Sequence, residues 1–172
     1  MRFILVKLIL FFFLIGISNS TENIRFININ YIVNNSEAGI SLNKILDNKN
    51  KKISSELNEL GKKLEKKKNK IVSQKNILKK AEFDNLVKDY DKDLKDFNNQ
   101  RKTKTDLFNT FRVNSKKKII ELLNPLITSY LKKESIQILL QKDKIIFGDN
   151  KLDITKDIFK IFNEKHKKIK FE

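Results

Sequence analysis

The chain has 172 residues, of which 40% are hydrophobic and 34% are charged, enough for one ordinary domain. Its net charge is +16, and it has no cysteine, one histidine, one proline and four glycines. This composition excludes disulfides, thiol catalysis and a Gly-rich phosphate-binding loop, and the carboxylates lie on charged helical stretches. We therefore expect no enzyme activity, no cofactor and no metal site.

The first twenty residues, "MRFILVKLILFFFLIGISNS", have the features of a secretory signal peptide. Arg2 and Lys7 precede an apolar run from Leu8 to Ile17, and Ser18-Asn19-Ser20 places small residues at a cleavage site. A stable bilayer crossing needs roughly 20 apolar residues, so an uncleaved anchor is the weaker alternative. We expect residues 1–20 to be removed and the mature protein to be exported from the cytoplasm.

The next expected element is a β-strand. Its alternating apolar residues are Ile27, Ile29, Tyr31 and Val33. Alternation with a period of two predicts a strand with one buried face. A single strand leaves its backbone N–H and C=O groups unpaired, so a partner strand must lie elsewhere in the chain.

A long helical region follows, because Ser36 before Glu37 is a typical N-cap and apolar residues then recur at helical spacing. Two interrupted heptad ladders succeed one another. They are Ile53, Leu57, Leu60, Leu64, Ile71, Leu78 and Ala81, and then Leu86, Tyr90, Phe97, Leu107 and Phe111. Two seams of similar length predict an antiparallel hairpin with its turn at residues 82–85.

The charges of the two arms are complementary. Residues 61–80 hold nine lysines against Glu65 alone, whereas four aspartates would lie alongside residues 72–79 after a fold-back near Phe83. They are Asp89, Asp91, Asp93 and Asp96. This pattern favours the pairing of the arms, although an AT-rich genome would also enrich the chain in lysine.

Past Pro125, where we expect a kink or a new turn, the period changes to two again. Ile136, Ile138 and Leu140 alternate with other residues, and a second apolar run at residues 145–147 ends at Gly148. This pattern predicts a β-hairpin, whose strand is the natural partner of the opening strand.

Asp153 can cap a last helix whose apolar residues cover the sheet, and a solvated basic tail follows. These apolar residues are Ile154, Ile158, Phe159 and Phe162. His166 lies at the start of this tail, with no carboxylate pattern around it, so we expect it to be solvated.

The predicted fold class is α+β: the chain ends form a small β-rich body, from which a long antiparallel helical hairpin projects. We place the body at residues 21–50 and 120–163, the hairpin at residues 51–119 and the basic tail at residues 164–172. A sheet this small is marginal alone, so we expect copies of the chain to assemble through a joint body that would bury the apolar residues. They are Ile27, Ile29, Tyr31, Val33, Ile136, Ile138 and Leu140.

In order and spacing, three features of the chain resemble the Skp (OmpH-like) family of periplasmic chaperones. They are the Ile27-Asn28 pair, the Ser36-x-Ala38-Gly39 helix start, and the Asp153-Ile154-Thr155 start of the last helix. The resemblance covers about residues 23–163, and the chain departs from it at Gln141, where the family often has Asp.

This resemblance implies a trimer in which three hairpins surround a cavity. It also implies that the cavity holds unfolded outer-membrane proteins without ATP and prevents their aggregation before membrane insertion.

A basic chain of this shape has alternative partners. Lipopolysaccharide or anionic lipid could bind the lysines of the first arm, which are also the candidate client-binding residues. They are Lys62, Lys63, Lys66, Lys67, Lys68 and Lys70. Nucleic acid is disfavoured, because the chain has a signal peptide, few arginines and no DNA-binding motif. The terminal β elements and the broken heptads argue against a purely structural coiled-coil spacer.

Overall fold

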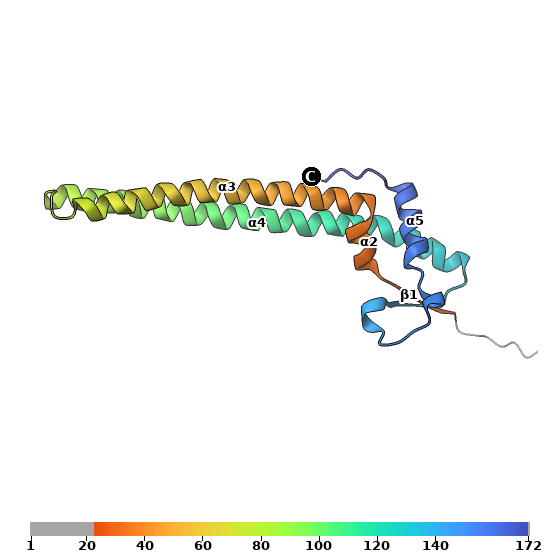
Figure 1. The fold of residues 1–172 in the computed structure, drawn as a ribbon. Helices are drawn as coiled ribbons and strands as arrows, with labels where there is room; N and C mark the ends of the chain where they lie inside the picture. The colour runs from red at the N-terminus through yellow and green to blue at the C-terminus, as the bar shows by residue number, and fades with distance from the viewer. Residues whose placement is uncertain (1–22, 172) are drawn as a thin grey trace, which may run out of the picture.

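The computed structural model describes residues 23–171, so the expected signal peptide lies outside the described part of the chain. Two long helices, α3 (Glu37–Gln74) and α4 (Lys80–Lys133), form an antiparallel hairpin. The remaining elements gather at the root of this hairpin (Figure 1). The predicted fold class is confirmed. No helix within residues 23–171 has both the length and the apolarity needed to cross a membrane.

The strands of the body are β1 (Ile24–Ile27) and β2 (Ile138–Gln141). They pair in parallel, with Ile24 opposite Ile138 and Ile27 opposite Gln141. The opening strand therefore does find its partner at the far end of the chain. A parallel pair needs a long crossover connection, and here the whole helical hairpin provides it.

The opening strand is shorter than predicted, because the chain turns into a helix, α2 (Ile29–Asn35), directly after it. The Asn28 side chain accepts a hydrogen bond from the Tyr31 backbone N–H (2.8 Å) and caps this helix. Ile32 and Val33 are neighbours in sequence and are both buried, which fits a helix and not an alternating strand. The predicted strand is therefore wrong beyond Ile27.

Ser36 forms the corner between α2 and α3, as its predicted role as an N-cap requires. Its side chain accepts a hydrogen bond from the Gly39 N–H (3.1 Å), and its own N–H donates to the Ile32 carbonyl (3.0 Å). The residue is fully buried. One serine thus ends α2 and begins α3, so the two helices meet at close range.

The turn of the hairpin lies at residues 75–79, and the predicted turn at residues 82–85 is wrong. Residues 82–85 belong to the first turns of α4, where the Lys79 carbonyl accepts hydrogen bonds from the backbone N–H groups of Glu82 and Phe83. Asp93 consequently pairs with Lys67, further down the first arm than the expected residues 72–79.

Pro125 lies inside α4 and neither ends the helix nor begins a new one. The residue itself is exposed, whereas the neighbouring Leu123 and Leu126 are buried. Packing of these leucines into the body holds the helix together across the hydrogen bond that proline removes.

After β2, the chain departs from the predicted β-hairpin. Two short 3₁₀ helices, Lys142–Lys144 and Asn150–Leu152, replace the second strand. The backbone of β1 instead pairs with the segment after them, because the Ile154 N–H donates to the Phe26 carbonyl (3.0 Å). With Ile154 at this position, the apolar run at residues 145–147 stays outside the sheet.

The last helix, α5 (Thr155–Lys165), crosses the root of the hairpin and closes the core (Figure 1). The Asp153 carboxylate accepts a hydrogen bond from the Thr155 N–H (2.9 Å), in agreement with the predicted cap. Ile158 and Phe162 are fully buried. The core residues come from β1, α2, α3, α4, α5 and the residue before α5: Ile27, Ile32, Val33, Ala38, Leu42, Leu46, Ile119, Leu123, Leu126, Ile127, Ile154, Ile158 and Phe162.

The charged pair at the start of α5 ties this end of the chain to the loop after β2. Lys142 Nζ lies 2.5 Å from Asp153 Oδ2. Burial raises the pKa of Asp153, but hydrogen bonds from Lys142 and Thr155 and the charge of Lys142 outweigh it and hold this pKa below its usual range.

Candidate functional site

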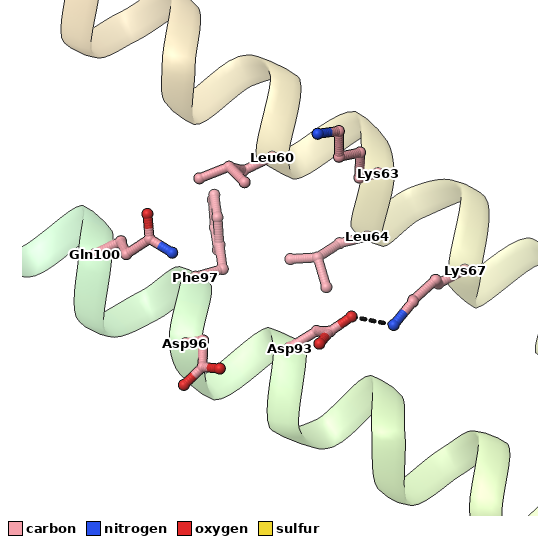
Figure 2. A pocket seen from close by; sticks show the side chains of 8 residues that line it. All are labelled: Leu60, Lys63, Leu64, Lys67, Asp93, Asp96, Phe97 and Gln100. Carbon is pink, nitrogen blue, oxygen red and sulfur yellow. Dashed lines mark hydrogen bonds and ion pairs between the residues drawn. The ribbon is translucent and has the colours of Figure 1, made fainter.

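The helical hairpin carries a shallow hollow between its arms, midway along its length (Figure 2). Leu60 and Leu64 of α3 point toward Phe97 of α4 and form its apolar part, and an ion pair between Lys67 and Asp93 closes one side. The hollow measures about 300 Å³. It arises because a charged pair occupies seam positions where a well-packed coiled coil would have apolar side chains.

A second hollow of about 300 Å³ lies nearer the body, between Ile53 and Phe108. Across this hollow, Lys104 of α4 forms an ion pair with Glu56 of α3, with 2.6 Å between Nζ and Oε2. The hydrogen bond and the charge of Lys104 hold the pKa of Glu56 below its usual range. Leu107, a predicted seam residue, is 65% exposed and lines the opening of this hollow, so its predicted place inside the seam is wrong.

Both hollows combine apolar floors with charged rims, and both are open to solvent. In each hollow, a lysine of one arm forms an ion pair with a carboxylate of the other arm. Within residues 23–171, no cluster of three or more histidine, cysteine, aspartate or glutamate side chains is placed to hold a metal ion. The apolar floors of such hollows can make non-covalent contacts with apolar groups.

The lysines that the sequence singles out lie on α3, beside the first hollow. All six are exposed: Lys62, Lys63, Lys66, Lys67, Lys68 and Lys70. Lys62, Lys66 and Lys70 recur every four residues and therefore share one face of the helix. Among the described residues, Lys67 is the member of this set that forms an ion pair. Lys62, Lys66 and Lys70 thus form a row of positive charge on the first arm.

The predicted trimer residues divide into two groups. Ile27 and Val33 are buried in the core of the single chain, and Ile29 and Ile136 pack partly against it. Tyr31, Ile138 and Leu140 are exposed by 47%, 43% and 44%, respectively. Ile138 and Leu140 alternate along β2 and thus share the outer face of this strand. Tyr31 lies on α2, with its ring 5.7 Å from that of Phe159.

The structure adds exposed apolar residues that the sequence patterns did not identify as surface. Ile146 and Phe147, which were expected in a strand, are almost fully exposed. Gly148 follows Phe147 in the sequence, and a Cβ at position 148 would come within 3.0 Å of the Phe26 ring. The only sequence signal for this arrangement was the glycine that ends the apolar run.

The sequence patterns also gave no signal for a hydrogen bond between α4 and α5 in the body. The Tyr130 hydroxyl of α4 donates to Asp157 Oδ2 of α5 (3.0 Å). Burial, together with this hydrogen bond and the charge of Asp157, raises the pKa of Tyr130 to about 12.

The chain belongs to the class of proteins in which a long antiparallel helical hairpin projects from a small α+β body. Segments from the two halves of the chain form this body. The model of the family of outer membrane proteins (OmpH-like) matches residues 23–162, so the chain belongs to the OmpH-like (Skp) family, as its resemblance indicated.

A solved structure supports the fold. An outer membrane chaperone (OmpH-like) from Caulobacter crescentus CB15 superposes with a TM-score of 0.77, covering 90% of this chain and 92% of that one. The two sequences are 12% identical, so this likeness concerns the fold. A search of curated protein sequences gave no significant match.

Proposed function

We propose that the protein is an ATP-independent chaperone of the periplasm, which holds unfolded outer-membrane proteins and prevents their aggregation before insertion. The observation that carries the proposal is the hairpin, whose arms stand clear of the body (Figure 1) and expose two hollows with apolar floors and charged rims, one of which is drawn in Figure 2. Membership of the OmpH-like family supports a chaperone role in general.

The physical basis of holding is many weak contacts. Each hollow can accept an apolar side chain without requiring one sequence, since its walls are flexible side chains on an open surface. Affinity then comes from the number of contacts and from enclosure. Half-buried aromatic residues along the second arm, such as Phe83, Tyr90 and Phe97, add to this surface while they also serve the seam.

Enclosure requires more than one hairpin, and we propose that three chains assemble through their bodies. The exposed face of β2 and the exposed loop residues Ile146 and Phe147 support this proposal. A sheet of two strands is marginal by itself, and a neighbouring chain would cover both features. Ile138→Lys with Leu140→Lys should yield a folded monomer by light scattering, whereas an unchanged mass would contradict this interface.

The direct test of function dilutes an outer-membrane β-barrel protein from urea with and without the mature chain. Light scattering should stay low when the chaperone is in molar excess and no nucleotide is added. Unchanged aggregation, or suppression that depends on ATP, would refute the proposal.

A shortened hairpin separates the arms from the body. Removing residues 55–68 and 92–105 deletes two heptads from each arm, keeps the turn and preserves the phase of the seam. The arms become about 21 Å shorter at ~1.5 Å per residue. This variant should assemble like the intact chain but protect the client poorly. Equal protection would show that the arms are dispensable.

The row of lysines on α3 supports a second candidate partner, lipopolysaccharide or an anionic lipid surface. Exposed charges are screened over roughly 8–10 Å at physiological salt, so binding to anionic vesicles should weaken as ionic strength rises. Replacing Lys66, Lys67, Lys68 and Lys70 with Gln should reduce this dependence. A control with the same change in charge replaces Lys88, Lys92, Lys95 and Lys102 of α4. Equal effects of the two variants would assign the binding to net charge alone.

A further inference from the structure

The hollows between the two arms lie in a line along one side of the hairpin. A third hollow of about 130 Å³ lies nearer the turn, between Ile71 of α3 and Leu86 of α4. On α3, Glu56, Lys63 and Lys70 each line one hollow, in order from the body to the turn. These three residues are seven positions apart. Residues at this spacing share one position of the heptad, so the three hollows open on the same side of the seam.

The second arm places the hollows on one side as well. Asp89 and Asp96 of α4 line the third and the first hollow, and Leu107 lines the second. The intervals of seven and eleven residues are close to two and three helical turns, so these side chains share one face of α4. From Asp89 to Leu107, the line of hollows extends for about 27 Å at ~1.5 Å per residue. The three hollows together are named the seam groove.

The basic tail of the chain lies at the body end of this groove. Residues 166–171 leave α5 and run back beside the root of the hairpin (Figure 1). Ile169 and Phe171 are partly buried against the core. Lys118 Nζ of α4 donates a hydrogen bond to the Lys170 carbonyl (3.0 Å). The predicted solvation of the tail is therefore wrong for its apolar residues.

The start of the tail is anchored as well. The His166 N–H donates to the Phe162 carbonyl (2.8 Å), and the two rings lie 5.2 Å apart. His166 is half-buried, which contradicts its predicted solvated state. Lys118, which holds the end of the tail, follows Leu107 by eleven residues and therefore lies on the groove side of α4. The tail thus limits the seam groove toward the body.

The seam groove has an apolar floor and charged rims of opposite sign. Its floor includes the half-buried residues Ile53, Leu60, Leu64, Ile71, Phe97 and Phe108. Nearer the turn, Lys63 and Lys70 form the rim on α3, and Asp89 and Asp96 form the rim on α4. Within residues 23–171, none of these four side chains forms an ion pair.

These rims fit a polypeptide. The lysines can donate hydrogen bonds to carbonyl groups and the aspartates can accept them from N–H groups, and an unpaired main chain presents both. An anionic lipid or a nucleic acid would be repelled by the rim of aspartates. The charges of the groove therefore favour a peptide chain over an anionic surface.

We propose that the seam groove binds one extended segment of an unfolded polypeptide, about nine residues long, whose apolar side chains enter the three hollows. The proposal rests on the proposed chaperone function and adds which side of the hairpin faces the client. An extended chain rises ~3.3 Å per residue, so eight steps cover about 26 Å, close to the length of the groove. Side chains at the first, fifth and ninth positions point to the same side of such a chain, so one of them can reach each hollow.

The test ligand is a peptide of about nine residues, with tyrosine at its first, fifth and ninth positions and serine or threonine elsewhere. Tyrosine offers an apolar ring for the floor of a hollow and a hydroxyl for its charged rim. The control peptide has the same composition, with its three tyrosines adjacent in the middle. Because the control can fill one hollow at a time, the spaced peptide should bind about tenfold more tightly.

A fluorescent label reports where the peptide lies. The chain has no cysteine, so Lys63→Cys and Lys70→Cys each place a single bimane label, which a contacting tyrosine quenches, on the groove rim. Lys68→Cys and Ser54→Cys place the label on the other flank of α3. Lys68 is five residues from Lys63, about 140° around the helix, and Ser54 is two heptads before Lys68. All four positions are exposed, so the fold should tolerate the label.

The spaced peptide should quench the labels at positions 63 and 70 about threefold more strongly than those at positions 54 and 68, with its affinity following from the contact of each ring. Equal quenching on the two flanks, or equal affinity of the two peptides, overturns the inference. Vesicles of phosphatidylglycerol should leave the spaced peptide bound. Its displacement by the vesicles would assign the groove to anionic lipid and would also overturn the inference.

A second pair of variants tests the groove without a label. Leu107 and Val113 of α4 are 65% and 59% exposed, so either can be replaced without opening the core. Val113 follows Leu107 by six residues and lies about 120° around the helix, away from the groove. Leu107→Ser should weaken binding of the spaced peptide about threefold, because the second hollow loses apolar contact, and Val113→Ser should leave it unchanged. Equal affinity of the two variants would contradict the proposal.

The aggregation assay is run on the unlabelled chain. Suppression of aggregation together with equal binding of the spaced and control peptides would refute the seam groove and leave the chaperone function in place. Selective binding of the spaced peptide without suppression of aggregation would refute the chaperone function and retain the groove.

Discussion

Replacing Gly39 with alanine should break the corner between α2 and α3. A Cβ at this position would overlap the carbonyl oxygen of Val33 and come within 2.9 Å of the Val33 carbonyl carbon and 3.0 Å of the Asn34 carbonyl carbon. These atoms belong to backbone, so no side chain can swing aside. The helices would have to separate, which would pull Ile32 and Val33 out of the core.

The expected cost follows from this geometry. Overpacking a well-packed interior costs 1–3 kcal/mol, and a clash with backbone lies at the upper end, so we expect a loss of about 3 kcal/mol in the free energy of unfolding. Gly61 is the matched control, because a Cβ there would meet nothing within 4 Å. Gly61→Ala in the middle of α3 should stabilise the chain by about 0.5–1 kcal/mol.

The assay is urea unfolding followed by circular dichroism at one fixed protein concentration, since assembly would make the stability depend on concentration. With a slope of about 2 kcal/mol per M urea, the midpoint of Gly39→Ala should fall by about 1.5 M, and that of Gly61→Ala should rise slightly. A Gly39→Ala midpoint equal to that of the parent chain would refute the close approach of the two helices.

Three further predictions test charge and hydrogen bonding. Because the pKa of Tyr130 is raised from 10.0 to about 12, the contribution of Tyr130 to stability is complete below pH 10 and is lost as the pH rises toward 12. Thermal unfolding of Tyr130→Phe across pH should show a smaller loss of stability at alkaline pH. At neutral pH, the free energy of unfolding of this variant should be lower by about 1 kcal/mol. Because the pKa of Asp153 is lowered from 3.8, the contribution of Asp153 to stability is present above pH 3.8 and is lost as the pH falls through the lowered pKa. Asp153→Asn should therefore lose less stability than the parent chain when the pH is lowered. The same dependence of thermal stability on acid pH in both proteins would contradict the role of this carboxylate. Asp93→Lys should lower the midpoint of thermal unfolding, because the introduced lysine would repel Lys67, and the second substitution Lys67→Asp should restore this midpoint. If the double variant does not regain the midpoint of the parent chain, Asp93 lies opposite another part of the first arm.

Local patterns in the sequence were sufficient for the elements whose signals agree with one another. The heptad ladders, the long stretch without proline and the opposite charges of the arms predicted the hairpin, and Ser36 and Asp153 marked the starts of α3 and α5. These signals depend on neighbours in the chain or on residues three and four apart, so they are readable without knowledge of the tertiary contacts.

Tertiary structure decided the elements whose signals were ambiguous. The run from Ile29 to Val33 fits a period of two and a helical period equally well, and packing against the core together with the Asn28 cap selected the helix. The seam between the arms is polar at Lys67 and Asp93, so its pattern does not show which residues of α3 face which residues of α4. The pairing of the arms in the structure, with Lys67 opposite Asp93, places the turn at residues 75–79. Whether the apolar residues of the tail are solvated depends on the core surface against which Ile169 and Phe171 pack, and no local pattern contains that surface.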